Sequence, residues 1–233
     1  MAEEILRGTL YIVPTPIGNL EDITLRALNV LKGVDVIAAE DTRTTKILLD
    51  HYAIQKPLLS FYSQNEQVRV PQIIQRLKGG DSVALVSDAG TPGISDPAHS
   101  IITASIENNI HIVPLPGATA FVPALVISGF ATHEFVFEGF LPHKKGRRTK
   151  LLRLKDEERT IILYESVHRI QKTLQEVLEH FGDRNVVVVR ELTKVFEEIT
   201  RGKVSSVLQE FSSRVMKGEF VLVIEGNNGR NEI

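Results

Sequence analysis

The segment from Val83 to Pro97 constrains the fold more than any other part of this chain. It begins as an apolar, β-branched run and breaks at Ser87 into a loop rich in glycine and proline. A buried strand followed by such a loop is typical of open α/β sheets, which bind ligands beyond the carboxyl ends of their strands. Small residues let a ligand approach the backbone, and prolines restrict the loop. The pattern predicts a strand over residues 82–87 and a ligand-binding loop after it, with an ordinary tight turn as the alternative.

Two further segments repeat this pattern of strand, glycine and proline loop, and helix. Residues 9–13 predict a strand, Pro14, Pro16 and Gly18 lie in the loop after it, and Asp22 is placed to cap a helix over residues 23–31. Residues 110–113 predict a third strand, followed by Pro114-Leu-Pro-Gly. None of the three loops carries the dinucleotide or P-loop glycine pattern. The three loops therefore predict one shared ligand cleft that is neither a nicotinamide site nor an ATP site of the usual kind.

The rest of the chain predicts an α/β fold with two α/β domains, residues 1–116 and 117–233. The first domain adds a strand over residues 34–39 and helices over 43–51, 68–78 and 98–108. Its strands read as buried on both faces, which predicts a mainly parallel sheet. The second domain is predicted to hold a mixed sheet. Its strands are expected over residues 135–139, 160–164, 186–190, 198–203 and 220–225, and its helices over 118–128, 147–154, 167–181 and 204–211.

Composition excludes several classes of site. The chain of 233 residues has no cysteine, so it can form neither disulfides nor thiol nucleophiles, and its seven histidines show no metal-ligand spacing. No metal site is therefore expected. No apolar run approaches the ~20 residues of a membrane span, and the first residues lack the pattern of a signal peptide. These observations predict a cytoplasmic protein.

One strongly basic segment stands out. Five of the seven residues from Lys144 to Lys150 are cationic, and no acidic residue occurs between Gly139 and Lys155. An uncompensated cluster of this kind predicts phosphate contacts, and a solvated linker is the alternative.

Three polar clusters follow predicted strands. Glu40-Asp-Thr-Arg occurs after the second strand, and Thr42 is expected to cap the next helix. Tyr164 either stacks on a base or belongs to the core, and Ser166 is expected to cap a helix. Arg190 and Lys194 either meet phosphates or form surface ion pairs with neighbouring glutamates. No G-x-S-x-G motif supports serine hydrolase chemistry.

Taken together and in order, six segments resemble the tetrapyrrole methylase superfamily, whose members use S-adenosylmethionine. The resemblance covers about residues 8–226, and its segments are residues 13–24, 40–43, 87–97, 116–120, 164–166 and 190–194. The sequence departs from the tetrapyrrole enzymes at Pro14-Thr-Pro-Ile-Gly-Asn, where they have a glycine-richer loop, and at Ala89-Gly-Thr-Pro, where they have Gly-Gly-Asp-Pro. Both departures favour the branch that methylates the ribose 2′-hydroxyl of a cytidine in small-subunit ribosomal RNA.

The resemblance implies two α/β domains with S-adenosylmethionine in the cleft between them, and a homodimer. Carried over by position, the cofactor contacts are expected at Ile17, Gly18, Ala89, Gly90, Thr91, Ile94, Thr119, Ala120, Tyr164, Glu165, Leu192 and Thr193. Many of these contacts are expected to involve the backbone, which accounts for the small residues in the loops.

The expected function is methyl transfer to ribosomal RNA or the small ribosomal subunit. A hydroxyl nucleophile needs a base, for which Glu40, Asp41, Asp88 and Lys194 are the candidates, and Lys194 would need a lowered pKa. The groups expected to position RNA are Arg43, Lys144, Lys145, Arg147, Arg148, Lys150 and Arg169. The alternatives are methylation of a tetrapyrrole or a protein by the same cleft, and a non-catalytic RNA-binding assembly factor.

Overall fold

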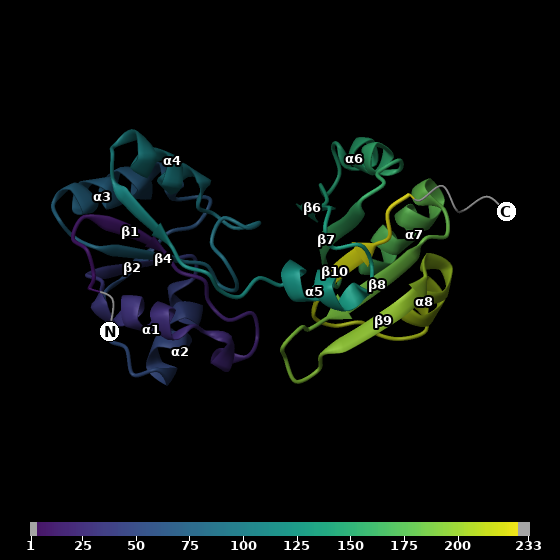
Figure 1. The fold of residues 1–233 in the computed structure, drawn as a ribbon, viewed down its shortest axis with the longest axis horizontal. Coiled ribbons are helices and arrows are strands. Elements are labelled where there is room, and N and C mark those ends of the chain that lie inside the picture. The colour runs from purple at the N-terminus through teal and green to yellow at the C-terminus, as the bar shows by residue number, and fades with distance from the viewer. Residues whose placement is uncertain (1–3, 228–233) are drawn as a thin grey trace. The chain divides into compact units, whose positions relative to one another are not determined.

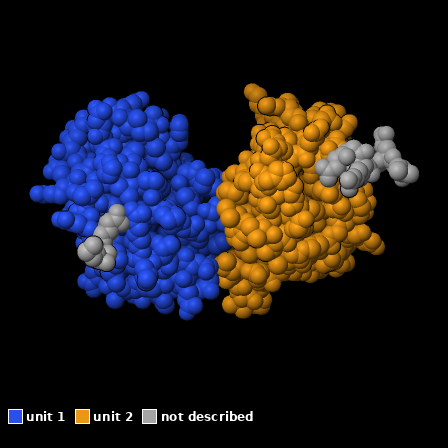
Figure 2. Space-filling model, in the orientation of Figure 1, with its two compact units in different colours: residues 1–119 blue, residues 120–233 orange. Residues whose placement is uncertain are grey.

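The computed structural model describes residues 4–227, which divide into two compact units (Figures 1 and 2). Unit 1 is Met1–Thr119 and unit 2 is Ala120–Ile233. The division falls three residues after the boundary predicted at residue 116. Each unit contains one sheet with its own core, so the α/β class predicted from sequence is confirmed.

Unit 1 is built on a five-stranded sheet in the order β3-β2-β4-β1-β5, and every strand pair is parallel. The strands are β1 (Thr9–Ile12), β2 (Val36–Ala39), β3 (Leu58–Ser60), β4 (Val83–Val86) and β5 (His111–Pro114). The three inner strands are buried at every position, as their continuous apolar runs predicted. Strand β3 was not predicted, because three half-buried residues at a sheet edge give only a short apolar run.

Helices cover both faces of this sheet (Figure 1). Alternate strand residues such as Tyr11 and Ile37 pack against α1 (Leu25–Gly33) and α2 (Thr42–His51). Their neighbours Leu10 and Val36 pack against α3 (Glu66–Lys78) and α4 (His99–Glu107) on the other face. A short 3-10 helix, η1 (Leu20–Asp22), precedes α1.

Two predicted helix caps in unit 1 are wrong. The Thr24 hydroxyl, rather than Asp22, caps α1 by accepting a hydrogen bond from the Ala27 amide at 3.0 Å. Asp22 belongs instead to η1. Asp41, rather than Thr42, caps α2, and its carboxylate accepts from the Arg43 amide at 2.8 Å.

Unit 2 contains a mixed sheet in the order β6-β7-β10-β8-β9. Only the β6 and β7 pair is parallel, and the other pairs are antiparallel, which confirms the predicted mixed sheet. The strands are β6 (Phe135–Phe140), β7 (Thr160–Ser166), β8 (Asn185–Arg190), β9 (Glu198–Lys203) and β10 (Glu219–Ile224).

The helices of unit 2 divide unequally between the two faces of its sheet. Helices α6 (Arg147–Leu154), α7 (Ile170–Phe181) and α8 (Val204–Ser212) pack on one face, and α5 (Phe121–Ser128) packs on the other. Gly129 ends α5 with φ of 77°, as predicted. Ser166 does not cap α7, because that helix begins four residues later, after Arg169, whose side chain forms no capping hydrogen bond among the described residues.

Candidate functional site

The site of unit 1 lies at the carboxyl ends of β1, β2 and β4. The helices that follow β1 and β2 cover one face of the sheet, whereas α4, which follows β4, covers the other. Where neighbouring strands send their connections to opposite faces, the loops part and leave a crevice that α/β proteins use for ligands. The end of β4 lies between two such neighbours, so the loop after it is the expected centre of a site.

The loops after β1 and β4 are joined by a pair of backbone hydrogen bonds. The amides of Thr15 and Gly90 each donate to the other residue's carbonyl at 2.9 Å. The buried Thr15 hydroxyl also donates to the Ser87 carbonyl at 3.1 Å. Gly90 has φ of 83°, a conformation that favours glycine, and the space beside it is bounded by Ile17 and the Ala118 carbonyl.

The loop after β5 joins the same assembly. The Thr91 hydroxyl donates to the Ala118 carbonyl at 3.0 Å and lies 2.9 Å from the Thr119 hydroxyl. Gly117 lies so close to Pro14 that a Cβ atom there would be 2.4 Å from the proline Cβ. The three glycine and proline loops predicted to adjoin one another therefore do so. They bring together seven predicted cofactor residues of unit 1, which are Ile17, Gly18, Ala89, Gly90, Thr91, Ile94 and Thr119.

Carboxylates from different strands meet beside these loops. The Asp88 amide donates to the Glu40 carboxylate at 3.3 Å, and the Asp41 amide donates to the Asp88 carboxylate at 3.0 Å. Arg43 is exposed and forms an ion pair with Asp41 at 2.6 Å. Three of the four predicted base candidates are thus grouped at the ends of β2 and β4.

The surroundings give these carboxyls different proton affinities. Burial raises the pKa of Glu40, and burial likewise raises the pKa of Asp88. In contrast, hydrogen bonds from Arg43 lower the pKa of Asp41 to about 2. A carboxylate that strongly favours its charged form is a weak proton acceptor, so Glu40 and Asp88 are better suited to act as bases than Asp41.

Asp96 is a further member of this cluster that sequence reasoning missed. Burial, and after it the charge of Glu40, raises the pKa of the Asp96 carboxyl to about 6. Its position between Ser95 and Pro97, at the end of the glycine and proline loop, was the available sequence signal. Ser95, which precedes it, has φ of 69° and so marks a constrained backbone.

Of the five residues predicted to meet the cofactor from unit 2, four lie near the carboxyl ends of β7 and β8, and the fifth, Ala120, directly precedes α5. The Tyr164 hydroxyl accepts from the Phe121 amide at 3.2 Å, and its ring contacts Phe137 edge to face. Leu192 packs against the core under α5, and the Thr193 amide donates to the Glu197 carboxylate at 2.6 Å. Thr193 has φ of 67°, a conformation uncommon for a branched residue.

Two predicted site residues of unit 2, Glu165 and Lys194, have side chains that are engaged within the unit. Glu165 is 1% exposed and its carboxylate accepts hydrogen bonds from other side chains of the unit, so its side chain is not available to a cofactor. Lys194 forms ion pairs with Glu191 and Glu219 at 2.9 and 2.8 Å. Burial lowers the pKa of Lys194, but these hydrogen bonds outweigh it and hold the pKa above its ordinary value. Lys194 therefore lacks the lowered pKa that a base would need.

The basic segment is less uniform than its sequence indicated. Arg147 is 4% exposed and forms an ion pair with Glu176 at 2.7 Å, so it cannot meet RNA on the surface. Lys150 is paired with Glu138. Arg169 is also largely buried against Glu165. Only Lys144, Lys145 and Arg148 remain exposed and form no ion pair with any residue between 4 and 227.

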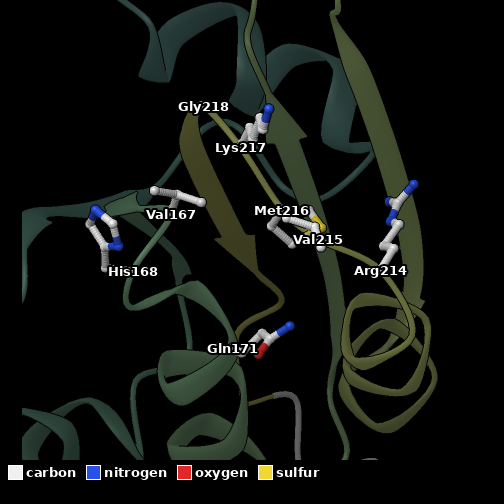
Figure 3. Close-up of a pocket in the computed structure, with 8 residues that line it drawn as sticks. All are labelled: Val167, His168, Gln171, Arg214, Val215, Met216, Lys217 and Gly218. Atoms are coloured by element: carbon white, nitrogen blue, oxygen red, sulfur yellow. The ribbon is translucent and has the colours of Figure 1, made fainter.

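A separate pocket of about 490 Å³ lies in unit 2, beside the start of α7 (Figure 3). Its lining residues are Val167, His168, Gln171, Arg214, Val215, Met216, Lys217 and Gly218. None of them is among the predicted site residues. Arg214 is paired with Glu198 and Glu210, so its charge is compensated.

The structure also bears on metals and membranes. Over residues 4–227, no three His, Asp or Glu side chains are grouped closely enough to hold a metal ion. Within the same range, no helix has the length and apolar character needed to cross a membrane.

Two solved structures resemble the fold. Uroporphyrin-III-C-methyltransferase from Thermus thermophilus aligns with a TM-score of 0.65 at 21% identity and covers 94% of both chains. A cobalt precorrin-4 methyltransferase aligns with a TM-score of 0.66 at 20% identity, covering 94% of this chain and 95% of its own. At these identities the likeness concerns the fold alone.

Relatives in sequence are much closer. The chain is 50% identical over 221 residues to "Ribosomal RNA small subunit methyltransferase I" of Synechocystis, covering 94% of this chain and 79% of the relative. It is 48% identical over 219 residues to the protein of that name from Thermotoga maritima, a match that covers 94% of this chain and 99% of the relative. It is 49% identical over 222 residues to the protein of that name from Bacillus subtilis, a match that covers 95% of this chain and 76% of the relative. Residues 9–208 match the family model described as Tetrapyrrole (Corrin/Porphyrin) Methylases, and with that match over most of its length the chain belongs to this family.

Proposed function

We propose that this protein transfers a methyl group from S-adenosylmethionine to the ribose 2′-hydroxyl of a cytidine in small-subunit ribosomal RNA. Its membership of a methylase family and the names of its relatives support methyl transfer to ribosomal RNA. The cofactor, the 2′-hydroxyl and the cytidine are the finer parts of the proposal. The observation that carries it is the joining of the loops after β1, β4 and β5 beside a group of carboxylates.

The residues of the site suit the proposed cofactor. When bound, S-adenosylmethionine supplies a methyl group activated by a sulfonium ion. The molecule carries positive charge at its sulfonium and ammonium groups, and Glu40, Asp88 and Asp96 offer negative charge next to the loops. Loop residues such as Ala89 and Gly18 are exposed and small, so they leave room for contacts with their backbone. We propose the twelve predicted contact positions as its binding residues, with Glu165 acting through its backbone.

The chain's own contribution to the reaction is to align the RNA and to accept a proton. Alignment supplies much of the rate when the methyl group is already activated. The ribose hydroxyl loses its proton as its oxygen gains the methyl group, and Glu40 or Asp88 accepts that proton. Both carboxyls hold protons more tightly than ordinary carboxyls, which makes them stronger acceptors than Asp41. Arg43, Lys144, Lys145 and Arg148 would hold RNA phosphates.

The first test uses radiolabelled S-adenosylmethionine with small ribosomal subunits that lack their modifications, followed by nuclease mapping of the label. We expect the label on a ribose 2′-oxygen of a cytidine. Label on a ribosomal protein would favour a protein substrate, and no label in RNA or protein, with cofactor binding intact, would favour a tetrapyrrole substrate. RNA binding that ignores S-adenosylmethionine, with no transfer, would indicate an assembly factor.

The second test identifies the base. Glu40→Gln and Asp88→Asn should each be assayed for kcat and for cofactor affinity, with Asp50→Asn on the exposed face of α2 as the matched control. Loss of a general base typically lowers the rate about 10²–10⁴-fold. We expect one of the two variants to show this loss while it still binds the cofactor. Equal, small losses in both would assign the pair to electrostatic support rather than to proton transfer.

The proposal extends to a cytoplasmic homodimer that acts on the ribosome. These parts rest on the resemblance to the family and on the named substrate of the relatives. Light scattering of the purified chain over a range of concentrations tests the dimer, and a monomer at all concentrations would contradict it.

A further inference from the structure

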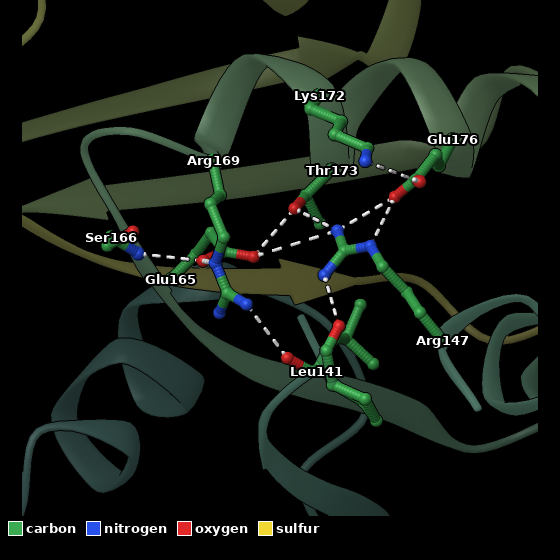
Figure 4. Close-up of polar contacts among 9 residues, drawn as sticks. Leu141, Arg147, Glu165, Ser166, Arg169, Lys172, Thr173 and Glu176 are labelled. Atoms are coloured by element: carbon green, nitrogen blue, oxygen red, sulfur yellow. Dashed lines mark hydrogen bonds and ion pairs between the residues drawn. The ribbon is translucent and has the colours of Figure 1, made fainter. Parts of the chain in front are cut away.

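A buried network of charged side chains adjoins the loop that connects β6 to α6 (Figure 4). Glu165 is at its centre, with a side chain that is 0% exposed. Its carboxylate accepts hydrogen bonds from Arg169 Nε at 2.7 Å, from the Thr173 hydroxyl at 2.6 Å and from the Ser166 amide at 2.8 Å. A buried carboxylate held by this many donors is fixed in position.

Arg147 completes the network from the first position of α6. Its Nε donates to Glu176 at 2.8 Å, and its Nη2 donates to the Thr173 hydroxyl at 2.7 Å while lying 3.9 Å from the Glu165 carboxylate. Two guanidinium groups therefore face two carboxylates. Apolar residues of similar size often stabilise a fold at least as well as a buried ion pair. A role in holding a defined geometry is therefore a better explanation for the network than stability alone.

The remaining donors of the network hold the backbone of the loop. Arg169 Nη1 donates to the Leu141 carbonyl at 3.0 Å, and Arg147 Nη1 donates to the Pro142 carbonyl at 3.3 Å. The Arg147 amide donates to the Lys144 carbonyl at 3.2 Å. The loop is thus tied to the network at its start and at its end.

The same loop carries the exposed cations of the basic segment. Lys144, Lys145 and Arg148 lie at its tip and at the first turn of α6, exposed and without an ion pair in the part of the chain that the structure describes. Cations on a backbone that is already ordered lose less conformational entropy when they bind phosphate than cations on a flexible linker do. An ordered loop that carries exposed cations is therefore suited to bind an anion.

We propose that Glu165, Arg147 and Arg169 are positioning residues that hold residues 143–148 in the conformation that binds phosphates of the RNA substrate. This inference rests on the proposed function, because it takes RNA as the substrate. It also assigns the three charged residues a role different from the one their sequence positions suggested. The side chains of Arg147, Glu165 and Arg169 act on the RNA only through the loop, and they contact neither RNA nor cofactor.

A double-mutant cycle tests this role. Arg147→Gln is measured in the unaltered chain and in a chain whose loop cations are removed by Lys144→Gln, Lys145→Gln and Arg148→Gln. The probe is unmodified small-subunit ribosomal RNA, titrated between 50 and 200 mM salt, a range in which phosphate contacts dominate affinity. We expect Arg147→Gln to weaken RNA binding by about tenfold in the unaltered chain and by less than about twofold where the cations are absent. The affinity for S-adenosylmethionine should stay unchanged in all four proteins.

Two controls separate positioning from charge and from folding. Arg153→Gln removes one cation from the exposed surface of the same helix, and we expect it to weaken binding much less than Arg147→Gln. Thr173→Val keeps the side-chain shape but removes the hydroxyl that links Arg147 to Glu165, and it replaces Arg147→Gln in the cycle if that variant does not fold. The thermal unfolding of both variants is compared with that of the unaltered protein to show that they fold.

The outcomes are distinct. Equal weakening of RNA binding in the two backgrounds, or no weakening in the unaltered chain, would overturn the positioning role while leaving RNA methylation intact. If the unaltered protein neither binds nor methylates ribosomal RNA, the proposed function fails, and the positioning role fails with it.

Discussion

At the scale of single residues, Asp96 shows the effect of bringing carboxylates from separate strands together. It lies in the loop after β4, and the charges of Glu40 and Asp88 act on it from the ends of β2 and β4. Burial of the Asp96 carboxyl is the larger cause, these charges add to it, and the pKa of Asp96 rises to about 6 from an ordinary value of 3.8. The folded protein therefore holds a proton that the unfolded chain would release, which couples stability to pH.

Asp96 should make the protein less stable as pH rises. Because the folded state binds this proton more tightly, the carboxyl opposes folding increasingly between pH 4 and pH 6, and its full cost is present above that range. Asp96→Asn should accordingly gain about 1–3 kcal/mol over the unaltered protein between pH 4 and pH 7. Urea unfolding at several pH values checks this, with Asp50→Asn as the matched control. A constant difference between Asp96→Asn and the unaltered protein would show that Asp96 does not titrate in this range.

Gly117 is a residue whose importance comes from close contact. A Cβ atom there would lie 2.4 Å from the Cβ of Pro14, so Gly117→Ala must separate the loops after β1 and β5. Overpacking of this kind typically costs about 1–3 kcal/mol. We expect that loss in denaturant unfolding, together with weaker binding of S-adenosylmethionine. Gly79→Ala, at the end of α3 with φ of −73°, should change stability by less than about 1 kcal/mol and leave cofactor binding intact.

At the scale of elements, sequence patterns located most helices and strands to within a few residues. Helix α6 and strand β9 begin and end where predicted. Helix α7 begins three residues later than predicted, since residues 167–169 form a turn in which the Arg169 amide bonds to the Ser166 carbonyl. The first residue of a helix depends on which side chain caps the unpaired backbone amides of its first turn. Several adjacent residues can often do this, so the sequence alone does not decide among them.

The start of α1 provides a direct test of this point. Thr24 caps the helix through its hydroxyl, whereas Asp22 is exposed in η1. Thr24→Ala should therefore cost about 1 kcal/mol of stability, the usual value for loss of a cap. Asp22→Ala should cost a few tenths of a kcal/mol at most, as is usual for surface substitutions. Equal losses in the two variants, measured by urea unfolding, would mean that the cap is shared.

At the scale of the whole molecule, the chain divides its tasks between two units with separate cores. Unit 1 holds the joined loops and the carboxylates, and unit 2 holds the basic loop on its buried network. The charge that is available to an acidic partner is consequently smaller than the five cations of the basic segment suggest. Three of the five are exposed and unpaired within the described part of the chain.

Removal of these three cations should change the salt dependence of RNA binding. Each phosphate contact to single-stranded nucleic acid contributes about 0.7 to the slope of log affinity against log salt. Lys144→Gln, Lys145→Gln and Arg148→Gln together should therefore make the slope shallower by about 2. Lys32→Gln, Lys46→Gln and Lys78→Gln, at exposed positions on the helices of unit 1, form the matched control. If both triple variants lose the same slope, binding depends on net charge rather than on the basic loop.

The sequence by itself determined the fold class, the parallel and mixed sheets, and the three adjoining loops. It could do so because strand burial and loop chemistry are local properties that apolar runs, glycines and prolines record directly. It also determined the family, as the match over residues 9–208 confirms. Local sequence could not determine the burial, the ion-pair partners or the pKa of each charged side chain. Arg147 was expected on the surface and is buried against Glu176, which lies 29 positions away, and Asp96 owes its raised pKa to burial and to carboxyls on other elements. Only the tertiary structure decided these states, because Coulomb energies and burial depend on neighbours in space rather than on neighbours along the chain.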